Sequence, residues 1–533
     1  MAVDFGVGTF GLAHIAGWVP HITNQPPLFD PLTTTAMTLQ RMLNAGAITS
    51  VQILNIYYRQ ILEYNAYLKA VYQLAPNALE RAAELDRLRS NGVLLGMLHG
   101  IPVLLKDNIG TEPSLGMNTT ACTPALVRSI ATNNSPVVDR LIAAGVIIMG
   151  KVTLSEMMWY KGLGVRVGWS SLCGQAQNPY IEGGIDKSDG ISGHSSPGGS
   201  SSGPAIAVAA GFAPLAVGTE TEGSINCPAT RNSLYAVKPT LGVVPNKGIV
   251  PISFHLDTAG PMAKSAEDIA SLLTVMIGND RPDASFGGYI TFLKGADGWN
   301  DLRVGLLDPD KWRYDKRLQT PAPVAIQQIR NATWEAYSRI ASLARSCRMN
   351  VPLRPDEDFD FEGSNGIIEL MITDFAPDFD KYLKGTIGSN VRDTEELLAW
   401  NAQHSNLVLP PEYPSQESIE QAVAFDKSSD RRGRILAHIS EVGKSLPDTL
   451  DKYDIDVIIG PADSWITKYS AATGHPHCSL PTGYIEYNGR PVGLTAIARS
   501  EATLITLMSA HEASFPQRRP PSAFLAHRSY CGD

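Results

Sequence analysis

The chain has 533 residues, with 44 Lys and Arg against 53 Asp and Glu, so its formal net charge is −9. Hydrophobic residues make up 44% of the chain and charged residues 18%, which is the composition of a large globular protein that builds a core. The mild acidic excess and the lack of Lys- or Arg-rich runs argue against a nucleic-acid partner, because nothing in the chain forms a footprint for a phosphate backbone.

The sequence predicts no membrane span and no targeting segment. The longest stretch without Asp, Glu, Lys or Arg, Gly190–Thr219, is rich in Gly, Ser and Pro, unlike a spanning helix. Residues 1–5 lack a basic region and include Asp4, so we expect no signal peptide and a cytoplasmic location.

Cysteine and histidine usage predicts neither a disulfide framework nor a metal centre. The six cysteines form no CxxC pair, which suits a reduced compartment. His475 and His477 are the only close histidine pair, and the neighbouring Gly474 and Pro476 indicate a turn. We therefore expect no metal and no cofactor.

In chain order, residues 1–95 form a helical N-terminal segment. Apolar residues at helical spacing predict one helix that stops at Gly46 and a second that follows Ser50. A third begins at Asn77, which stands at capping-box spacing from Glu80, and ends at Gly92.

Residues 95–275 have the alternating texture of an α/β fold. Short apolar runs predict strands and periodic segments predict helices, over residues 101–105, 136–144, 146–149, 204–210 and 215–217 in order. We expect a large mixed, mostly parallel, twisted sheet with helices on both faces and its centre in this region.

Beyond residue 282 the pattern weakens and then returns. Residues 304–307 read as a strand and 326–340 as an amphipathic helix. Residues 350–420, with acidic runs and paired prolines, are predicted to be an irregular insertion or cap. Regular apolar runs resume over 455–533, which predicts a C-terminal segment that closes a single domain spanning 1–533.

A run of small residues, Ser195–Gly203, precedes an apolar helix and strand. Glycine-rich turns between buried elements present backbone N–H groups to anions. The string Gly199–Gly203 matches the G-x-S-x-G nucleophile elbow, with Ser201 as the nucleophile. That elbow directly follows a strand, whereas residues 183–199 have loop composition, so the context does not favour this reading.

A second reading joins Ser200, Ser224 and Lys106. It rests on blocks that resemble the amidase signature family in order and spacing: Gly100–Ile109, Gly198–Gly203, Gly218–Ile225 and Val237–Thr240. Ser200 and Ser224 are 24 residues apart, the separation between bridging serine and nucleophile in that family. The sequence around Ser224 is most similar to that of the peptide-amidase-like branch, which has fungal and plant members.

The resemblance implies a Ser-Ser-Lys mechanism. Lys106 takes a proton from Ser200, Ser200 takes one from Ser224, and Ser224 attacks the amide carbonyl to form an acyl-enzyme; in relatives the peptide bond before the relay serine is cis. A lysine is a base only when neutral, which requires a pKa well below its ordinary value of about 10.4. Lys106 ends a fully apolar run, so we expect its stem to be buried.

The resemblance also implies an oxyanion hole made by the backbone N–H groups of Thr221, Glu222, Gly223 and Ser224. Candidate pocket residues are Met117, Trp159, Tyr160, Trp169 and Ser201, although aromatic residues at helical spacing are also typical of a core.

Four positions depart from the family pattern. Pro204 replaces a small residue at the start of a helix, where proline is tolerated. Glu222 stands where the branch has Asp, Asn226 where many relatives have Arg, and Cys122 where relatives have Gly near the site. The 181–193 loop and the 350–420 insertion are expected to rim the entrance, either as solvated decoration or as a specificity lid.

The predicted function is hydrolysis of a carboxamide, non-peptide or C-terminal, by a monomer or homodimer whose partner is a small-molecule amide. Alternatives are an esterase or a biosynthetic acyltransferase that uses the same acyl-enzyme, an amidotransferase subunit, and an inactive binding relative.

Overall fold

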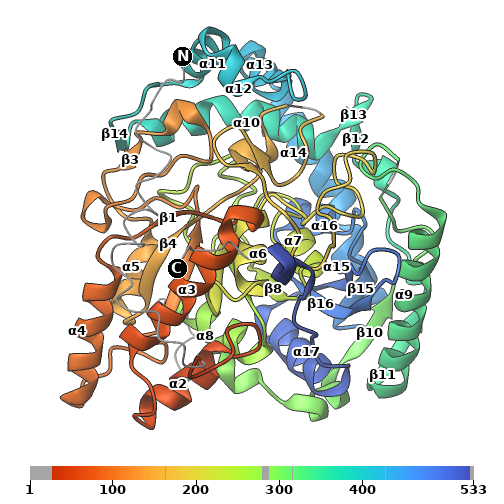
Figure 1. Cartoon of the computed structure of the whole chain (residues 1–533). Coiled ribbons are helices and arrows are strands. Elements are labelled where there is room, and N and C mark those ends of the chain that lie inside the picture. Colours follow the sequence, from red (N-terminus) through yellow and green to blue (C-terminus); the bar gives the residue numbers. More distant parts are fainter. Residues whose placement is uncertain (1–26, 163, 279–286, 315, 427, 528–533) are drawn as a thin grey trace.

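The computed structural model describes residues 27–162, 164–278, 287–314, 316–426 and 428–527. The signal-peptide prediction concerns residues outside these ranges. Within them an 11-stranded sheet runs through the molecule (Figure 1). Its strands, in spatial order, are β1 (Val71–Leu74), β4 (Ile147–Val152), β2 (Pro102–Lys106), β7 (Leu215–Glu220), β9 (Thr258–Ala263), β8 (Tyr235–Lys238), β16 (His477–Tyr484), β17 (Pro491–Ala498), β15 (Val457–Pro461), β10 (Arg303–Leu306) and β11 (Ser346–Met349).

The sheet is mixed, as predicted, and its parallel strands form two groups. β4, β2 and β7 are parallel in the region expected to be the centre, and β15, β10 and β11 are parallel at the far side. The strands between β7 and β15 pair antiparallel. β16 and β17 illustrate the reason: only six residues join them, too few for a parallel crossover.

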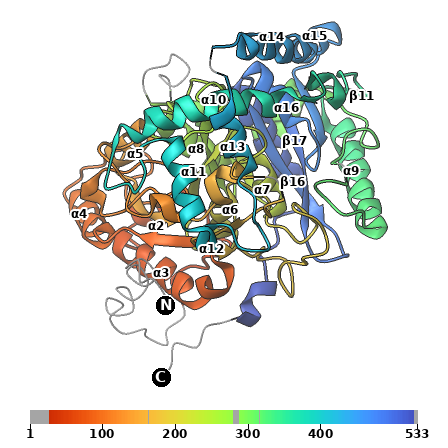
Figure 2. The same cartoon turned by 90° about the horizontal axis from the view of Figure 1, so that it is seen from above.

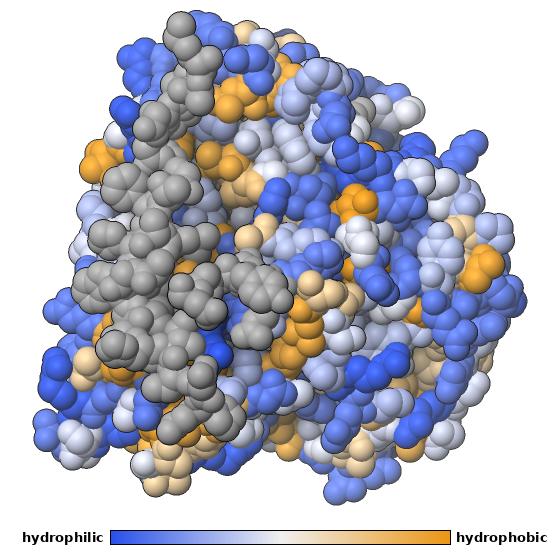
Figure 3. Space-filling model, in the orientation of Figure 1, coloured by the Kyte–Doolittle hydropathy of each residue, from blue (hydrophilic) through white to orange (hydrophobic). Residues whose placement is uncertain are grey.

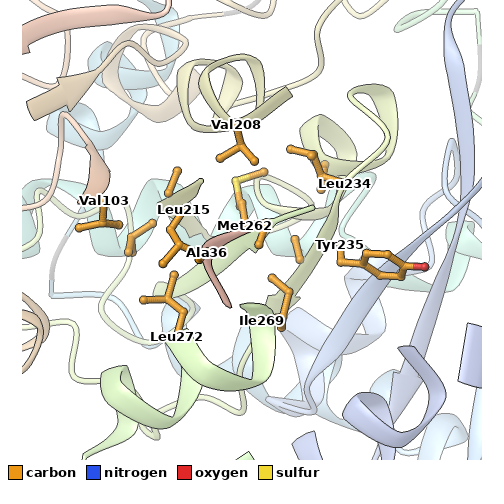
Figure 4. Close-up of a cluster of buried hydrophobic side chains, with 14 of the residues drawn as sticks. Ala36, Val103, Val208, Leu215, Leu234, Tyr235, Met262, Ile269 and Leu272 are labelled. Atoms are coloured by element: carbon orange, nitrogen blue, oxygen red, sulfur yellow. The ribbon is translucent and has the colours of Figure 1, made fainter. Parts of the chain in front are cut away.

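Helices cover both faces of the sheet. On one face α6 (Ser202–Ala209) packs on β2 and β7, and α7 (Asn226–Arg231) packs on β8, β16 and β17. The other face is covered by α5 (Pro136–Ala143), α8 (Ala266–Ile277) and α17 (Glu501–Ser514). Figure 4 shows the result, with Val208 above the strands and Ile269 and Leu272 below them.

The N-terminal helices are confirmed as α2 (Ala36–Asn44), α3 (Ser50–Leu68) and α4 (Ala78–Ser90). The capping box lies elsewhere than predicted. Asn77 makes no side-chain cap to α4, and its amide nitrogen donates to Ser114 O at 3.3 Å. The reciprocal pair is Thr49 with Gln52, at the start of α3.

The 350–420 segment is helical, which corrects the prediction of irregular structure. It contains α10 (Gly366–Leu383), α11 (Thr394–Gln403), α12 (Ser405–Val408) and the start of α13 (Glu417–Ala424), gathered at one end of the molecule (Figures 1 and 2). Asn365 caps α10 and Asp393 caps α11 through their side-chain oxygens, signals hidden within the polar composition. Their apolar faces pack against residues 121–126 and 154–160.

Of the remaining α-helices described, one packs on β11, β16 and β17, and the other three share a core cluster with β15. They are α9 (Pro323–Leu343), α14 (Arg431–Gly443), α15 (Ser445–Lys452) and α16 (Thr467–Thr473). Two-stranded ladders pair β3 (Ile130–Ala131) with β14 (Thr386–Ile387), β5 (Trp169–Ser170) with β6 (Gly174–Gln175), and β12 (Asp360–Phe361) with β13 (Ser364–Asn365).

The hydropathy of the visible surface agrees with the composition expected of a globular protein. On the face seen in Figure 3, hydrophilic side chains predominate and apolar ones lie in small, separate groups. Among the described helices none has the length and apolarity needed to cross a membrane.

Candidate active site

Lys106 is the last residue of β2, and its side chain is fully buried. Its Nζ lies 2.8 Å from Ser200 Oγ and donates to Thr219 O at 3.0 Å. A neutral amine has two hydrogens and one lone pair, so a hydrogen given to Thr219 leaves the lone pair free for a hydroxyl. The predicted base and the predicted relay are therefore in direct contact.

Burial lowers the pKa of Lys106 from 10.5 to about 7, although the nearby carboxylates of Asp257 and Glu220 oppose the shift. Removing an ammonium group from water is costly, and here this cost exceeds the attraction of two acidic neighbours. Near neutral pH a large share of Lys106 is therefore uncharged and able to accept a proton.

The Ser200 loop is packed tightly between sheet and helix. The peptide bond between Gly199 and Ser200 is cis, as the resemblance implies. A Cβ at Gly203 would lie 2.2 Å from Thr153 O, so only glycine allows this approach of α6 to the chain beyond β4. Ser155 N–H donates to Ser200 O at 3.1 Å, which fixes the relay residue from the other side.

Ser201 is buried and its hydroxyl is already engaged. It donates to Thr219 O at 3.0 Å, and its own N–H donates to Ser224 O at 3.0 Å. No strand precedes it, because residues 183–199 are loop and turn. Ser201 thus ties the two serine loops together, and the elbow reading lacks the preceding strand that it requires.

The loop after β7 is held by Glu220, which is not among the site residues predicted from the sequence. Its buried carboxylate accepts hydrogen bonds from the backbone N–H groups of Gly223 at 2.9 Å, Ile225 at 2.6 Å and Asn226 at 3.1 Å. His477 Nε2, at the start of β16, lies 3.1 Å from the same carboxylate. Ser224, within this loop, is half-buried.

The charge on Glu220 is strongly favoured. Burial alone would raise its pKa, but His477, the Ile225 N–H and Lys238 lower the pKa from 4.5 to about 2. The sequence signal that could have identified this anchor is a Glu three residues before a glycine, since that spacing resembles a cap that reaches forward to a turn. In the structure Gly223 has a φ of +74°.

Two further acids flank the loop. Thr221 Oγ1 donates to Asp257 Oδ1 at 2.5 Å, and burial raises the pKa of Asp257 to about 7. Glu222 accepts a hydrogen bond from Thr467 Oγ1 at the start of α16, and burial raises its pKa to about 7. Glu222, which stands where the family branch has Asp, therefore has a hydrogen-bond donor within the protein, the Thr467 hydroxyl.

Of the candidate pocket residues, Met117 and Tyr160 are buried, whereas Trp159 and Trp169 are half-buried. Met117 is buried in the main core. Trp159 and Trp169 are half-buried, and the Trp169 ring lies 4.6 Å from Tyr413 of the insertion. Tyr160 is buried against Phe375 of α10.

Met157, Met158 and Trp159 all have positive φ values, of 51°, 56° and 70°. Non-glycine residues rarely adopt this left-handed backbone conformation, so the three consecutive residues store backbone strain of about 1–3 kcal/mol each. The segment is anchored at Ser155, which bonds Ser200, and at Met157, whose N–H donates to Ala121 O at 3.1 Å.

Within the described ranges, no group of three or more His, Cys, Asp and Glu side chains is arranged to hold a metal ion.

A family model described as Amidase matches residues 52–351. A protein of Arabidopsis thaliana named a probable amidase is 30% identical over 513 residues, which cover 93% of each chain. The chain belongs to the amidase family. It is accordingly an amidohydrolase, an enzyme that hydrolyses C–N amide bonds.

Solved structures agree with the family and the fold. The peptide amidase of Stenotrophomonas maltophilia superposes with a TM-score of 0.80 at 31% identity, covering 92% of this chain and 98% of its own. An amidase family protein of Bacillus anthracis superposes with a TM-score of 0.78 at 30% identity, covering 92% of both chains. The predicted family and α/β fold are therefore confirmed.

Proposed function

We propose that this amidase hydrolyses a carboxamide, a non-peptide or C-terminal amide, through Ser224, Ser200 and Lys106. The observation that carries the proposal is the contact of 2.8 Å between Lys106 Nζ and Ser200 Oγ at a fully buried lysine with a lowered pKa. Other buried lysines of this chain, such as Lys151 and Lys264, also have lowered pKa values, so it is the contact with a serine hydroxyl that favours a general-base role for Lys106.

In the proposed reaction, neutral Lys106 accepts the Ser200 proton as Ser200 accepts the Ser224 proton. Ser224 Oγ attacks the carbonyl carbon, the C–N bond breaks, and the departing amine takes the proton back through the same relay. Water then attacks the acyl-enzyme along the reverse path and releases the acid.

The oxyanion hole is proposed to use the backbone N–H groups of Thr221, Glu222 and Ser224. Gly223 is omitted from this set because its N–H donates to Glu220. Gly223 instead has a φ of +74°, which shapes the turn that orients the N–H groups of Glu222 and Ser224. N–H groups fixed in advance stabilise a developing oxyanion without reorganisation.

We further propose that the 181–193 loop and the insertion form the rim of the substrate entrance. Lys187 of the loop lies 3.0 Å from Glu412 of the insertion, and Tyr413 packs on Trp169. The buried pair Lys161 and Glu156, 3.2 Å apart, supports the same region, because Lys161 also donates to Val408 O of the insertion.

Intact mass after exposure to a fluorophosphonate probe tests the proposal. Wild type is expected to gain one adduct, and Ser224→Ala none. Ser201→Ala is the matched control, since it removes a neighbouring hydroxyl and should still be labelled. Labelling that persists in Ser224→Ala, or that is lost only in Ser201→Ala, would transfer the nucleophile role to Ser201. Product analysis with amide substrates then defines the acyl group.

A further inference from the structure

Two cysteines from distant parts of the sequence bring their thiols together beside the site. Cys122 Sγ and Cys173 Sγ are 3.7 Å apart. Cys122 is fully buried in the segment after Asp107, whereas Cys173 is half-buried in the turn that joins β5 to β6. Among the described cysteines, which also include Cys227, Cys347 and Cys478, this is the pair in contact.

We propose that Cys122 and Cys173 form a reversible intramolecular disulfide when a peroxide reaches the protein. The Cys173 sulfur attacks one peroxide oxygen and the O–O bond breaks, giving a sulfenic acid and water. The Cys122 sulfur then attacks the Cys173 sulfur, the S–O bond breaks, and a second water leaves with the Cys122 proton. Two thiols lose two electrons in total, and one peroxide is reduced to two waters.

The surroundings assign the order of these steps. Cys173 is the more exposed of the two residues, so it meets the oxidant first. Burial raises the pKa of Cys122, and the neighbouring Asp107, 3.9 Å from its sulfur, acts in the same direction. A buried thiol of this kind is inert toward solvent oxidants but remains placed to resolve a sulfenic acid that forms beside it.

The two sulfurs must move closer together before the disulfide can form, and the contacts around them indicate which neighbouring segments would move as well. The sulfurs must approach from 3.7 Å to about 2.05 Å. The β5–β6 ladder has only two residues in each strand and can yield. On the other side, Ala121 is bonded to Asp107 O at 3.0 Å and accepts from Met157. From Met157 the chain leads to Ser155, which bonds Ser200. Oxidation should therefore disturb the relay serine.

The modification is tested on the full chain with hydrogen peroxide, followed by intact mass and peptide mapping without reductant. The expected result is a mass lower by two hydrogen atoms, a Cys122–Cys173 cross-linked peptide, and full reversal by dithiothreitol. Cys173→Ser should abolish the cross-link. Cys347→Ser, another half-buried cysteine, is the matched control and should retain it. Sulfinic or sulfonic acid on Cys173 without cross-linked peptide, or no change in either thiol, would overturn the proposal.

The effect on the site is read from the rate of fluorophosphonate labelling, and this part alone depends on the proposed function. Cross-linked wild type should label at least fivefold more slowly than reduced wild type, whereas peroxide-treated Cys173→Ser should keep its untreated rate. Equal rates for cross-linked and reduced protein would refute the coupling to Ser200. The mass measurement does not involve Ser224, so its outcome stands independently of the nucleophile assignment.

Discussion

The pH dependence of Ser224 reactivity should follow the protonation of Lys106. With the pKa lowered from 10.5 to about 7, about half of the lysine is neutral at pH 7. At the ordinary value only roughly one molecule in 3,000 would be neutral, so burial supplies a gain of more than a thousandfold in active base. Between pH 7 and pH 5 the neutral fraction falls about fiftyfold, while above pH 8 it approaches a plateau.

The assay is the second-order rate of fluorophosphonate labelling from pH 5 to 10, corrected with Ser224→Ala. We expect a single rise with a midpoint near pH 7. Asp257→Asn should move the midpoint to lower pH, because Asp257 raises the pKa of Lys106. Lys106→Arg should be unlabelled at every pH, since a guanidinium group stays charged. A flat profile below pH 7, or a midpoint near 10, would refute a neutral-lysine base.

Three further variants test individual contacts. Glu220→Gln should lower the free energy of unfolding by about 3 kcal/mol at pH 7, because the pKa of Glu220 is lowered from 4.5 to about 2; chemical denaturation with matched slopes measures this, and a loss below 1 kcal/mol would contradict the anchor role. Lys106→Met should be more thermally stable than wild type, and the difference in melting temperature should be largest below pH 7. The difference should shrink between pH 7 and 10.5, because there Lys106 is protonated in unfolded wild type and neutral in the folded protein, so wild type gains stability as the pH rises. A difference that stays constant with pH would argue against the lowered pKa. Ser201→Ala loses its bond to Thr219 O and should unfold about 1 kcal/mol more easily while keeping its labelling, checked by parallel melting and mass measurements.

The sequence was sufficient for the parts of the fold in which local pattern and final environment agree. β2 is apolar throughout and buried throughout, so its existence, and the burial of the lysine that ends it, followed from the residues alone. The helices before residue 95 were likewise predicted from apolar spacing and later found as α2, α3 and α4. In each case short-range information determined the outcome.

The features that could not be predicted from the sequence depend on contacts between residues that are far apart along the chain. Glu220 reads as an ordinary polar residue until β16 brings His477 to within 3.1 Å of it, across more than 250 residues. Asn77 has the right spacing for a cap, but its side-chain oxygen caps nothing and its amide nitrogen donates to Ser114 O, 37 residues along the chain. The insertion looked irregular because its helices are stabilised by packing on residues 121–126 and 154–160, which composition does not reveal.

The strand order has a consequence for how the protein is made. β8, which ends at Lys238, pairs on one edge with β16, which begins at His477. During synthesis that edge therefore waits for more than two hundred residues, while its unpaired backbone groups offer a template to other chains. The same late strand supplies the histidine that meets Glu220. A nascent chain that already holds Lys106, Ser200 and Ser224 thus still lacks the strand beside β8, and until β16 is made this edge is open to pairing with other chains.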